Sequence, residues 1–146
     1  MRLQCPPVCI LLFIMLCSCK PQWHAPEPVS MPEVTLPDTV RKLSVEEASA
    51  LIASTPGLRI LDLRMEEELA RDGRFPKAAH VDFFHHARLA EHLAALEKDA
   101  PCLILCALGG RAEKVVGRMH AAGFTRLHLL EGGIEAWIKA GQAMEK

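Results

Sequence analysis

Cys102-Leu103-Ile104-Leu105-Cys106-Ala107-Leu108-Gly109-Gly110-Arg111 joins an apolar run to a loop that contains two glycines. The run from Cys102 to Cys106 lacks polar alternation, which is typical of a strand buried on both faces of a parallel sheet. Beyond Arg111, apolar residues recur at helical spacing. The stretch therefore predicts a buried strand, a tight loop and a helix, which is the unit from which α/β folds are built.

The alternation of strands and helices continues on both sides of this unit. Ser44 and Glu47 form a Ser-x-x-Glu capping box, which predicts a helix from residue 45. Further strands are expected over 58–63, near 81–83 and over 126–130, and further helices over 66–71, 85–97, 111–122 and 134–140. This order predicts an α/β fold with a central, mainly parallel sheet and helices on both faces.

Composition places the chain among globular proteins. Its 146 residues, half of them hydrophobic, suffice for one domain with its own core. The formal net charge is −1 and no basic run occurs, so we expect no nucleic acid among its partners. The histidines and cysteines form no His-x-x-x-His or Cys-x-x-Cys pair, so neither a metal site nor a cofactor is predicted.

The first residues have the pattern of a signal peptide. An unbroken apolar run covers 8–17 and spans about 15 Å as a helix, half of what a membrane crossing needs. With Arg2 before it and small residues after it, this run predicts a signal peptide over 1–18. Leu16-Cys17-Ser18-Cys19 resembles a bacterial lipobox, which implies cleavage before Cys19 and a lipid on its thiol. The alternative is an ordinary secretory signal, in which Cys19 has no such role.

A proline-rich stretch follows the predicted lipid site. Five prolines among polar residues over 20–38 disfavour helix and central strand, so residues 19–38 are interpreted as a tether and 39–146 as the domain. The resemblance to a lipobox implies a lipid-anchored, periplasm-facing protein of the bacterial cell envelope. Lys20 stands where Asp is the usual signal for inner-membrane retention, which favours the outer membrane. Without the lipid, a secreted or periplasmic protein is expected.

Two cysteines remain in the predicted domain. Cys102 and Cys106 lie four residues apart on one strand, about 13 Å, whereas a disulfide needs Cα atoms within about 7 Å. We therefore expect Cys102 to be a packing residue and Cys106 to have no disulfide partner in the domain.

Cys106 occupies the position at which open α/β sheets bind ligands, the carboxyl end of a strand. The glycines at 109 and 110 allow successive N–H groups to point inward and form an anion-binding concavity. A helix N-terminus and Arg111 favour the thiolate, which is the nucleophilic form. The alternative is a buried strand cysteine followed by an ordinary glycine turn.

Four segments resemble motifs of the rhodanese family. Cys106-x-x-Gly109-x-Arg111 resembles its active-site loop, and Leu61-Asp62-Leu63-Arg64 resembles its Asp-Val-Arg strand end. The other two segments are Gly73-Arg74-Phe75-Pro76-Lys77-Ala78, similar to Gly-His-Ile-Pro-Gly-Ala, and the closing Gly132-Gly133…Trp137…Gly141. The matches occur in the family's order over 40–144. Arg74 and Lys77 depart from the family's His and Gly.

The resemblance implies a rhodanese-like fold and a sulfurtransferase. Cys106 is expected to take a sulfane sulfur from a donor such as thiosulfate, become a persulfide, and pass the sulfur to a thiol or a cyanide-like acceptor. The loop N–H groups of Ala107, Leu108, Gly109, Gly110 and Arg111 would stabilise the terminal sulfur. Arg111 would hold the loop or the donor, while Asp62, at a strand end with Arg64, would support the loop by accepting hydrogen bonds.

Two other functions remain open at this point. One is a non-catalytic rhodanese-like module that binds a partner or delivers sulfur within an envelope complex; the intact loop favours an enzyme over it. The other is a cysteine-dependent phosphatase. Phosphatases of this fold carry five residues between Cys and Arg, and here there are four, so the loop favours a single sulfur atom over phosphate.

Overall fold

The computed structural model describes residues 39–146. The predicted signal peptide over 1–18, the lipid site at Cys19 and the tether over 19–38 lie outside the described residues. Within 39–146, no helix has the length and apolar character needed to cross a membrane.

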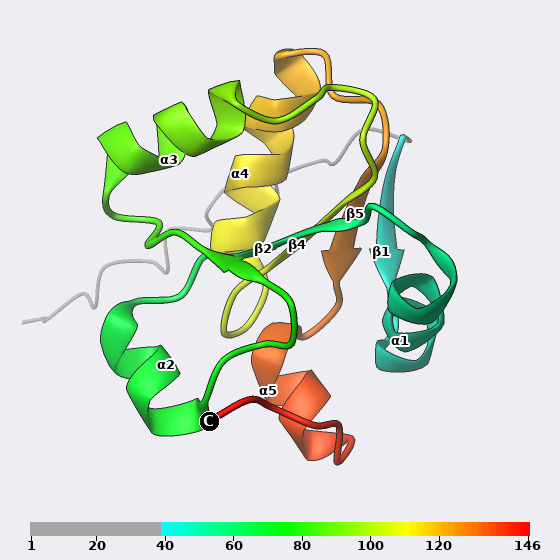
Figure 1. Ribbon diagram of the computed structural model, residues 1–146, viewed down its shortest axis with the longest axis vertical. Coiled ribbons are helices and arrows are strands. Elements are labelled where there is room, and N and C mark those ends of the chain that lie inside the picture. Colours follow the sequence, from blue (N-terminus) through cyan, green and yellow to red (C-terminus); the bar gives the residue numbers. More distant parts are fainter. Residues whose placement is uncertain (1–38) are drawn as a thin grey trace, which may run out of the picture. The chain divides into compact units, whose positions relative to one another are not determined.

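Five strands form one sheet in which every neighbouring pair is parallel, in the order β1-β5-β4-β2-β3 (Figure 1). The strands are β1 (Val40–Leu43), β2 (Arg59–Asp62), β3 (Ala79–His80), β4 (Cys102–Leu105) and β5 (Leu127–Leu130). The central strand β4 is buried at every residue, as its unbroken apolar sequence predicts. The predicted α/β fold with a parallel sheet is confirmed.

Helices cover both faces of the sheet, as predicted. They are α1 (Val45–Ser54), α2 (Glu66–Asp72), α3 (His86–Ala94), α4 (Gly110–Ala121) and α5 (Gly133–Lys139). Side chains of α3 and α4 pack with Ile104 in one buried cluster, and those of α1 and α5 pack with Leu103 and Leu105 in another. Successive side chains of β4 point to opposite faces of the sheet and thus pack in two cores, one on each face.

The structure differs from the prediction by more than one residue at three places. Strand β1 was not predicted, because at this edge of the sheet Arg41 and Lys42 are exposed and leave no apolar run. The third strand is Ala79–His80 and not 81–83; the chain continues beside β2 through the Val81 and Phe83 amides, but only two residues pair in the ladder. Helix α3 ends at Ala94 and not at 97. Beyond Ala94 the chain forms a tighter turn, in which the Leu96 amide donates to the Leu93 carbonyl three residues earlier.

One departure from the family motif has a backbone consequence. Lys77 has φ +60° and is the one non-glycine residue with positive φ in the part of the chain that the structure describes. The rhodanese motif has glycine at this position, and glycine adopts this conformation without strain. Lys77 therefore carries a local conformational cost at a position where the motif avoids it.

Candidate active site

Cys106 is the first residue after β4 and lies at the carboxyl edge of the sheet. The residue is 1% exposed, and its Sγ accepts a hydrogen bond of 3.1 Å from the Gly109 amide. Gly109 precedes helix α4 and has φ +110°, a conformation that glycine adopts readily. The predicted loop thus turns an amide back onto the sulfur, and the first turn of α4 follows directly.

The first residues of α5 donate hydrogen bonds to the backbone of the same loop. The amides of Ile134 and Glu135 donate to the carbonyls of Cys106 and Ala107 at 2.9 and 3.1 Å. Gly133 has φ +61°, and a Cβ at this position would collide with both of those carbonyl oxygens. Glycine at 133 therefore lets α5 approach the loop closely enough for its amides to bind the Cys106 and Ala107 carbonyls.

Arg111 forms an ion pair with Glu68, a residue that the sequence did not identify. Nη1 and Nη2 of Arg111 donate to Oε2 and Oε1 of Glu68 at 2.7 and 2.6 Å, and the two side chains are 19% and 11% exposed. This contact, aided by the hydrogen bond from the Met65 amide, holds the pKa of Glu68 below its ordinary value despite burial. Glu68 in turn raises the pKa of Arg111, with a smaller contribution from the Cys106 sulfur. The Arg111 guanidinium is therefore directed to the Glu68 carboxylate through both of its terminal nitrogens.

Asp62 and Arg64 form a buried pair that supports α2. Arg64 is fully buried and donates to the Asp62 carboxylate from Nε and Nη2 at 3.1 and 2.8 Å. Its Nη2 also donates to the Gly73 carbonyl at 2.9 Å, just after the last residue of α2. The predicted support from Asp62 to the Cys106 loop is therefore indirect. The Asp62 carboxylate accepts hydrogen bonds from the backbone amide and the side chain of Arg64, and Arg64 in turn fixes the end of α2, the helix that carries Glu68.

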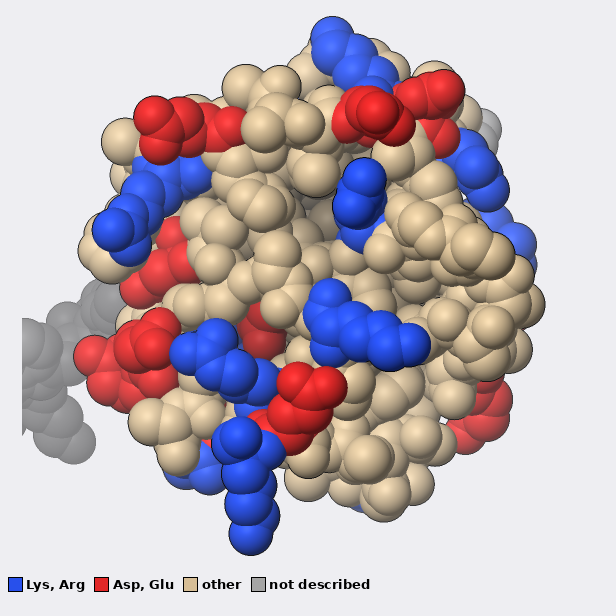
Figure 2. Space-filling view, viewed as in Figure 1, with Lys and Arg blue, Asp and Glu red and all other residues tan. Residues whose placement is uncertain are grey.

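Leu108 lies at the outer tip of the Cys106 loop and is 66% exposed. It borders an open groove of about 640 Å³ between the end of α2, the loop and α5. The remaining lining residues are Arg71, Asp72, Gly132, Glu135, Ala136, Ile138 and Lys139. Both signs of charge are present there, and Figure 2 shows acidic and basic side chains interspersed over the visible face.

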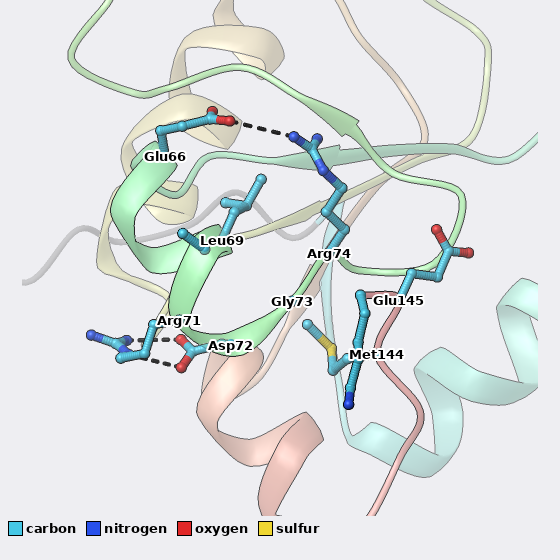
Figure 3. Close-up of a pocket in the computed structure, with 10 residues that line it drawn as sticks. Glu66, Leu69, Arg71, Asp72, Gly73, Arg74, Met144 and Glu145 are labelled. Carbon is cyan, nitrogen blue, oxygen red and sulfur yellow. Dashed lines mark hydrogen bonds and ion pairs between the residues drawn. The ribbon is translucent and has the colours of Figure 1, made fainter.

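A second cavity, of about 510 Å³, lies between α2 and the segment 144–146 (Figure 3). Here the backbones of Arg74 and Glu145 exchange two hydrogen bonds, and the Arg74 side chain pairs with Glu66 at 3.4 Å. Cys106 does not line this cavity. The Arg74 backbone thus holds the C-terminal segment, whereas the Arg74 side chain, which is the departure from the motif, pairs with Glu66.

Cys102 is buried at the start of β4, and burial raises the pKa of its thiol. Neither Cys102 nor Cys106 forms a disulfide, and the expectation that Cys102 is a packing residue agrees with its burial. Trp137 also packs in the core, against Phe75 with ring centroids 4.6 Å apart. Within 39–146, no three His, Cys, Asp or Glu side chains are grouped in a way that could hold a metal.

Comparison with known proteins agrees with this architecture. A family model described as Rhodanese-like domain matches residues 44–140. The chain is 28% identical over 100 residues to thiosulfate sulfurtransferase GlpE of Pseudomonas aeruginosa, covering 68% of this chain and 86% of that protein. It is 26% identical over 102 residues to a sulfurtransferase of Allochromatium vinosum, covering 70% and 92%.

The fold agrees with solved structures as well. A rhodanese-like domain protein from Staphylococcus aureus superposes with a TM-score of 0.59 at 25% identity, over 73% of this chain and 99% of that one. The family match runs from the cap of α1 to the end of α5, which includes strands β2 to β5 and the whole Cys106 loop. The chain therefore belongs to the rhodanese-like domain family.

Proposed function

We propose that the protein is a sulfurtransferase in which Cys106 carries the sulfur as a persulfide. The Cys106 thiolate attacks the outer sulfur of a donor such as thiosulfate, an S–S bond forms, and sulfite leaves with the electron pair of the broken S–S bond. The resulting persulfide anion then gives its outer sulfur to a thiophilic acceptor. With cyanide the products are thiocyanate and the Cys106 thiolate, so charge and sulfur balance over the cycle.

The observation that carries this proposal is the hydrogen bond from the Gly109 amide to the Cys106 sulfur. A backbone donor fixed by the loop costs no reorganisation when negative charge shifts from the sulfur to the atom beyond it. The N-terminus of α4 adds a partial positive charge on the same side. These donors would stabilise the negative charge that the persulfide mechanism places on sulfur at the end of β4.

The spacing of the loop supports sulfur transfer over phosphate hydrolysis. Four residues separate Cys106 from Arg111, and both terminal nitrogens of Arg111 are engaged by Glu68. A phosphatase uses such a guanidinium to clamp the phosphate oxygens bidentately. The site has the shorter loop, and one N–H of each terminal nitrogen of Arg111 is already directed to Glu68.

The test is production of thiocyanate from thiosulfate and cyanide by the full chain. We expect turnover by the unaltered protein and none by Cys106→Ser, and no release of phosphate from an aryl phosphate by either. Turnover that survives Cys106→Ser would overturn the assignment of the nucleophile. Aryl phosphate hydrolysis without thiocyanate formation would replace it with the phosphatase, and neither activity in a folded protein would favour the binding module.

We also propose that the mature protein is attached to the bacterial envelope through a lipid on Cys19, facing the periplasm. The apolar run over 8–17 and the Leu16-Cys17-Ser18-Cys19 sequence support this proposal. Metabolic labelling with a fatty-acid analogue in a bacterial host should mark the unaltered chain and Cys9→Ser, and should not mark Cys19→Ser. Label retained by Cys19→Ser, or an unlabelled unaltered chain, would contradict it.

A further inference from the structure

Arg111 in the Cys106 loop and Arg64 after β2 are each paired with a carboxylate of the protein itself. Arg111 pairs with Glu68 at 2.6 Å, and Arg64 pairs with Asp62 at 2.8 Å and lies 3.6 Å from Asp72. Neither guanidinium therefore offers an uncompensated charge to a bound anion. What remains for an anion at Cys106 is the N–H donation of the loop and the start of α4, which suits one sulfur atom better than a multiply charged group.

The geometry of the Arg111 contact matters as much as its charge. A guanidinium binds carboxylate, sulfate and phosphate through the same paired N–H donors. In this chain one N–H of each of Nη1 and Nη2 is directed to a Glu68 oxygen. To bind Arg111, an oxyanion would have to displace the Glu68 carboxylate or contact a guanidinium whose charge Glu68 already balances.

Glu68 is held in place by contacts of its own. Its Oε2 also accepts a hydrogen bond of 2.7 Å from the Met65 amide at the start of α2. The other end of α2 is fixed by the bond from Arg64 to the Gly73 carbonyl. Because both ends of this short helix are anchored, the carboxylate cannot swing away from Arg111 without breaking the cap at Met65.

We propose that Glu68 is a positioning residue that sets the anion selectivity of the Cys106 loop. By occupying the paired donors of Arg111, it weakens the binding of tetrahedral oxyanions and favours donors that present sulfane sulfur without an oxyanion group, such as alkyl persulfides. Transfer from such a donor is balanced: the Cys106 thiolate takes the terminal sulfur, and the alkyl thiolate leaves with the bond pair. The proposal rests on the proposed function for its sulfur donors, but its anion-binding part can be tested without sulfur transfer.

The first test is direct binding of inorganic phosphate to the full chain, measured by calorimetry. Glu68→Gln keeps the shape of the side chain and an oxygen that can accept from Met65, but it removes the charge that balances Arg111. Glu67→Gln removes the same charge from an exposed neighbour on the same helix and is the matched control. We expect Glu68→Gln to bind phosphate about tenfold more tightly than the unaltered protein, since charged hydrogen bonds to arginine are strong, and Glu67→Gln to bind it unchanged.

The second test separates donors by their Michaelis constants. In Glu68→Gln the KM for thiosulfate should fall, while the KM for an alkyl persulfide should stay within about twofold, because only the former carries an oxyanion group. Equal phosphate affinity in Glu68→Gln and the unaltered protein, or an equal gain in Glu67→Gln, would overturn the proposal. Absence of sulfur transfer from every donor, combined with the expected phosphate result, would overturn the proposed function while leaving the role of Glu68 in anion binding intact.

Discussion

The carboxylate of Glu68 and the guanidinium of Arg111 meet through two hydrogen bonds of 2.7 and 2.6 Å, although 43 residues separate them in the chain. Glu68 lies on α2, which follows β2, and Arg111 lies in the first turn of α4, which follows β4. Because β2 and β4 are parallel neighbours, the helices that follow them begin at the same edge of the sheet. The pair therefore ties α2 to the helix that starts at the nucleophile loop.

This ion pair predicts a pH dependence of stability. The pKa of Glu68 lies below its ordinary value of 4.5 in the folded protein, chiefly through the hydrogen bonds from Arg111. The stabilisation is therefore fully present above the unfolded-state pKa and is lost as pH falls through the lower folded-state pKa. Denaturant titrations should show Glu68→Gln less stable than the unaltered protein at pH 7, with the gap closing in acid. A stability difference between the two proteins that stays the same at every pH, even where all carboxyl groups are protonated, would show that the ion pair does not cause it.

Asp62 should be among the most sensitive positions for stability. Asp62→Ala leaves the fully buried guanidinium of Arg64 with only the more distant carboxylate of Asp72, at 3.6 Å. Removing one partner of a buried ion pair costs roughly 3–5 kcal/mol of unfolding free energy. Asp99→Ala, at an exposed acid, is the control and should change stability by less than about 0.5 kcal/mol. Similar losses in the two variants, measured by urea denaturation, would mean that the buried pair has no special importance.

Gly133 and Gly141 offer a matched test of the loop support. Both have positive φ, at +61° and +73°, but a Cβ at Gly133 meets the carbonyls of Cys106 and Ala107, whereas a Cβ at Gly141 meets no atom within 4 Å. Gly141→Ala should cost about 1 kcal/mol from backbone strain alone and retain sulfur transfer. Gly133→Ala should cost more and lose most sulfur transfer, as measured by thiocyanate formation. Equal activity in the two variants would show that α5 does not shape the loop.

Cys102 should be dispensable for the chemistry. Its thiol is buried, its pKa is raised by desolvation, and it forms no disulfide. Cys102→Ala should therefore form thiocyanate at the rate of the unaltered protein while losing about 1 kcal/mol of stability from the smaller buried side chain. A variant that folds but no longer transfers sulfur would show that Cys102 takes part in the cycle.

The sequence predicted the nucleophile loop well because its signals are local. The apolar run of β4, the glycines and the spacing to Arg111 all lie within residues 102–111, and the structure places them together as expected. Strand β1 was not predicted because Arg41 and Lys42 are exposed at the edge of the sheet and interrupt any apolar run. Its pairing with β5 in the structure, and not its hydrophobicity, identifies it as a strand.

Glu68 was missed for a different reason. Glu66, Glu67 and Glu68 are consecutive acids, and the sequence alone does not say which of them faces Arg111. The buried contact of Arg64 with the Gly73 carbonyl fixes the end of α2 and with it the side of the helix that faces α4. The available signal was the position of these acids. They begin a helix directly after β2, and β2 is the neighbour of β4, the strand that leads to Cys106.

The most direct test of Cys106 as the persulfide carrier is the intact mass of the full chain after incubation with thiosulfate and then with cyanide, beside Cys106→Ser. We expect the unaltered protein to gain the mass of one sulfur atom from thiosulfate and to lose it to cyanide, while Cys106→Ser gains none. No added sulfur on the folded unaltered protein, or the same gain on Cys106→Ser, would contradict the assignment of Cys106 as the persulfide carrier.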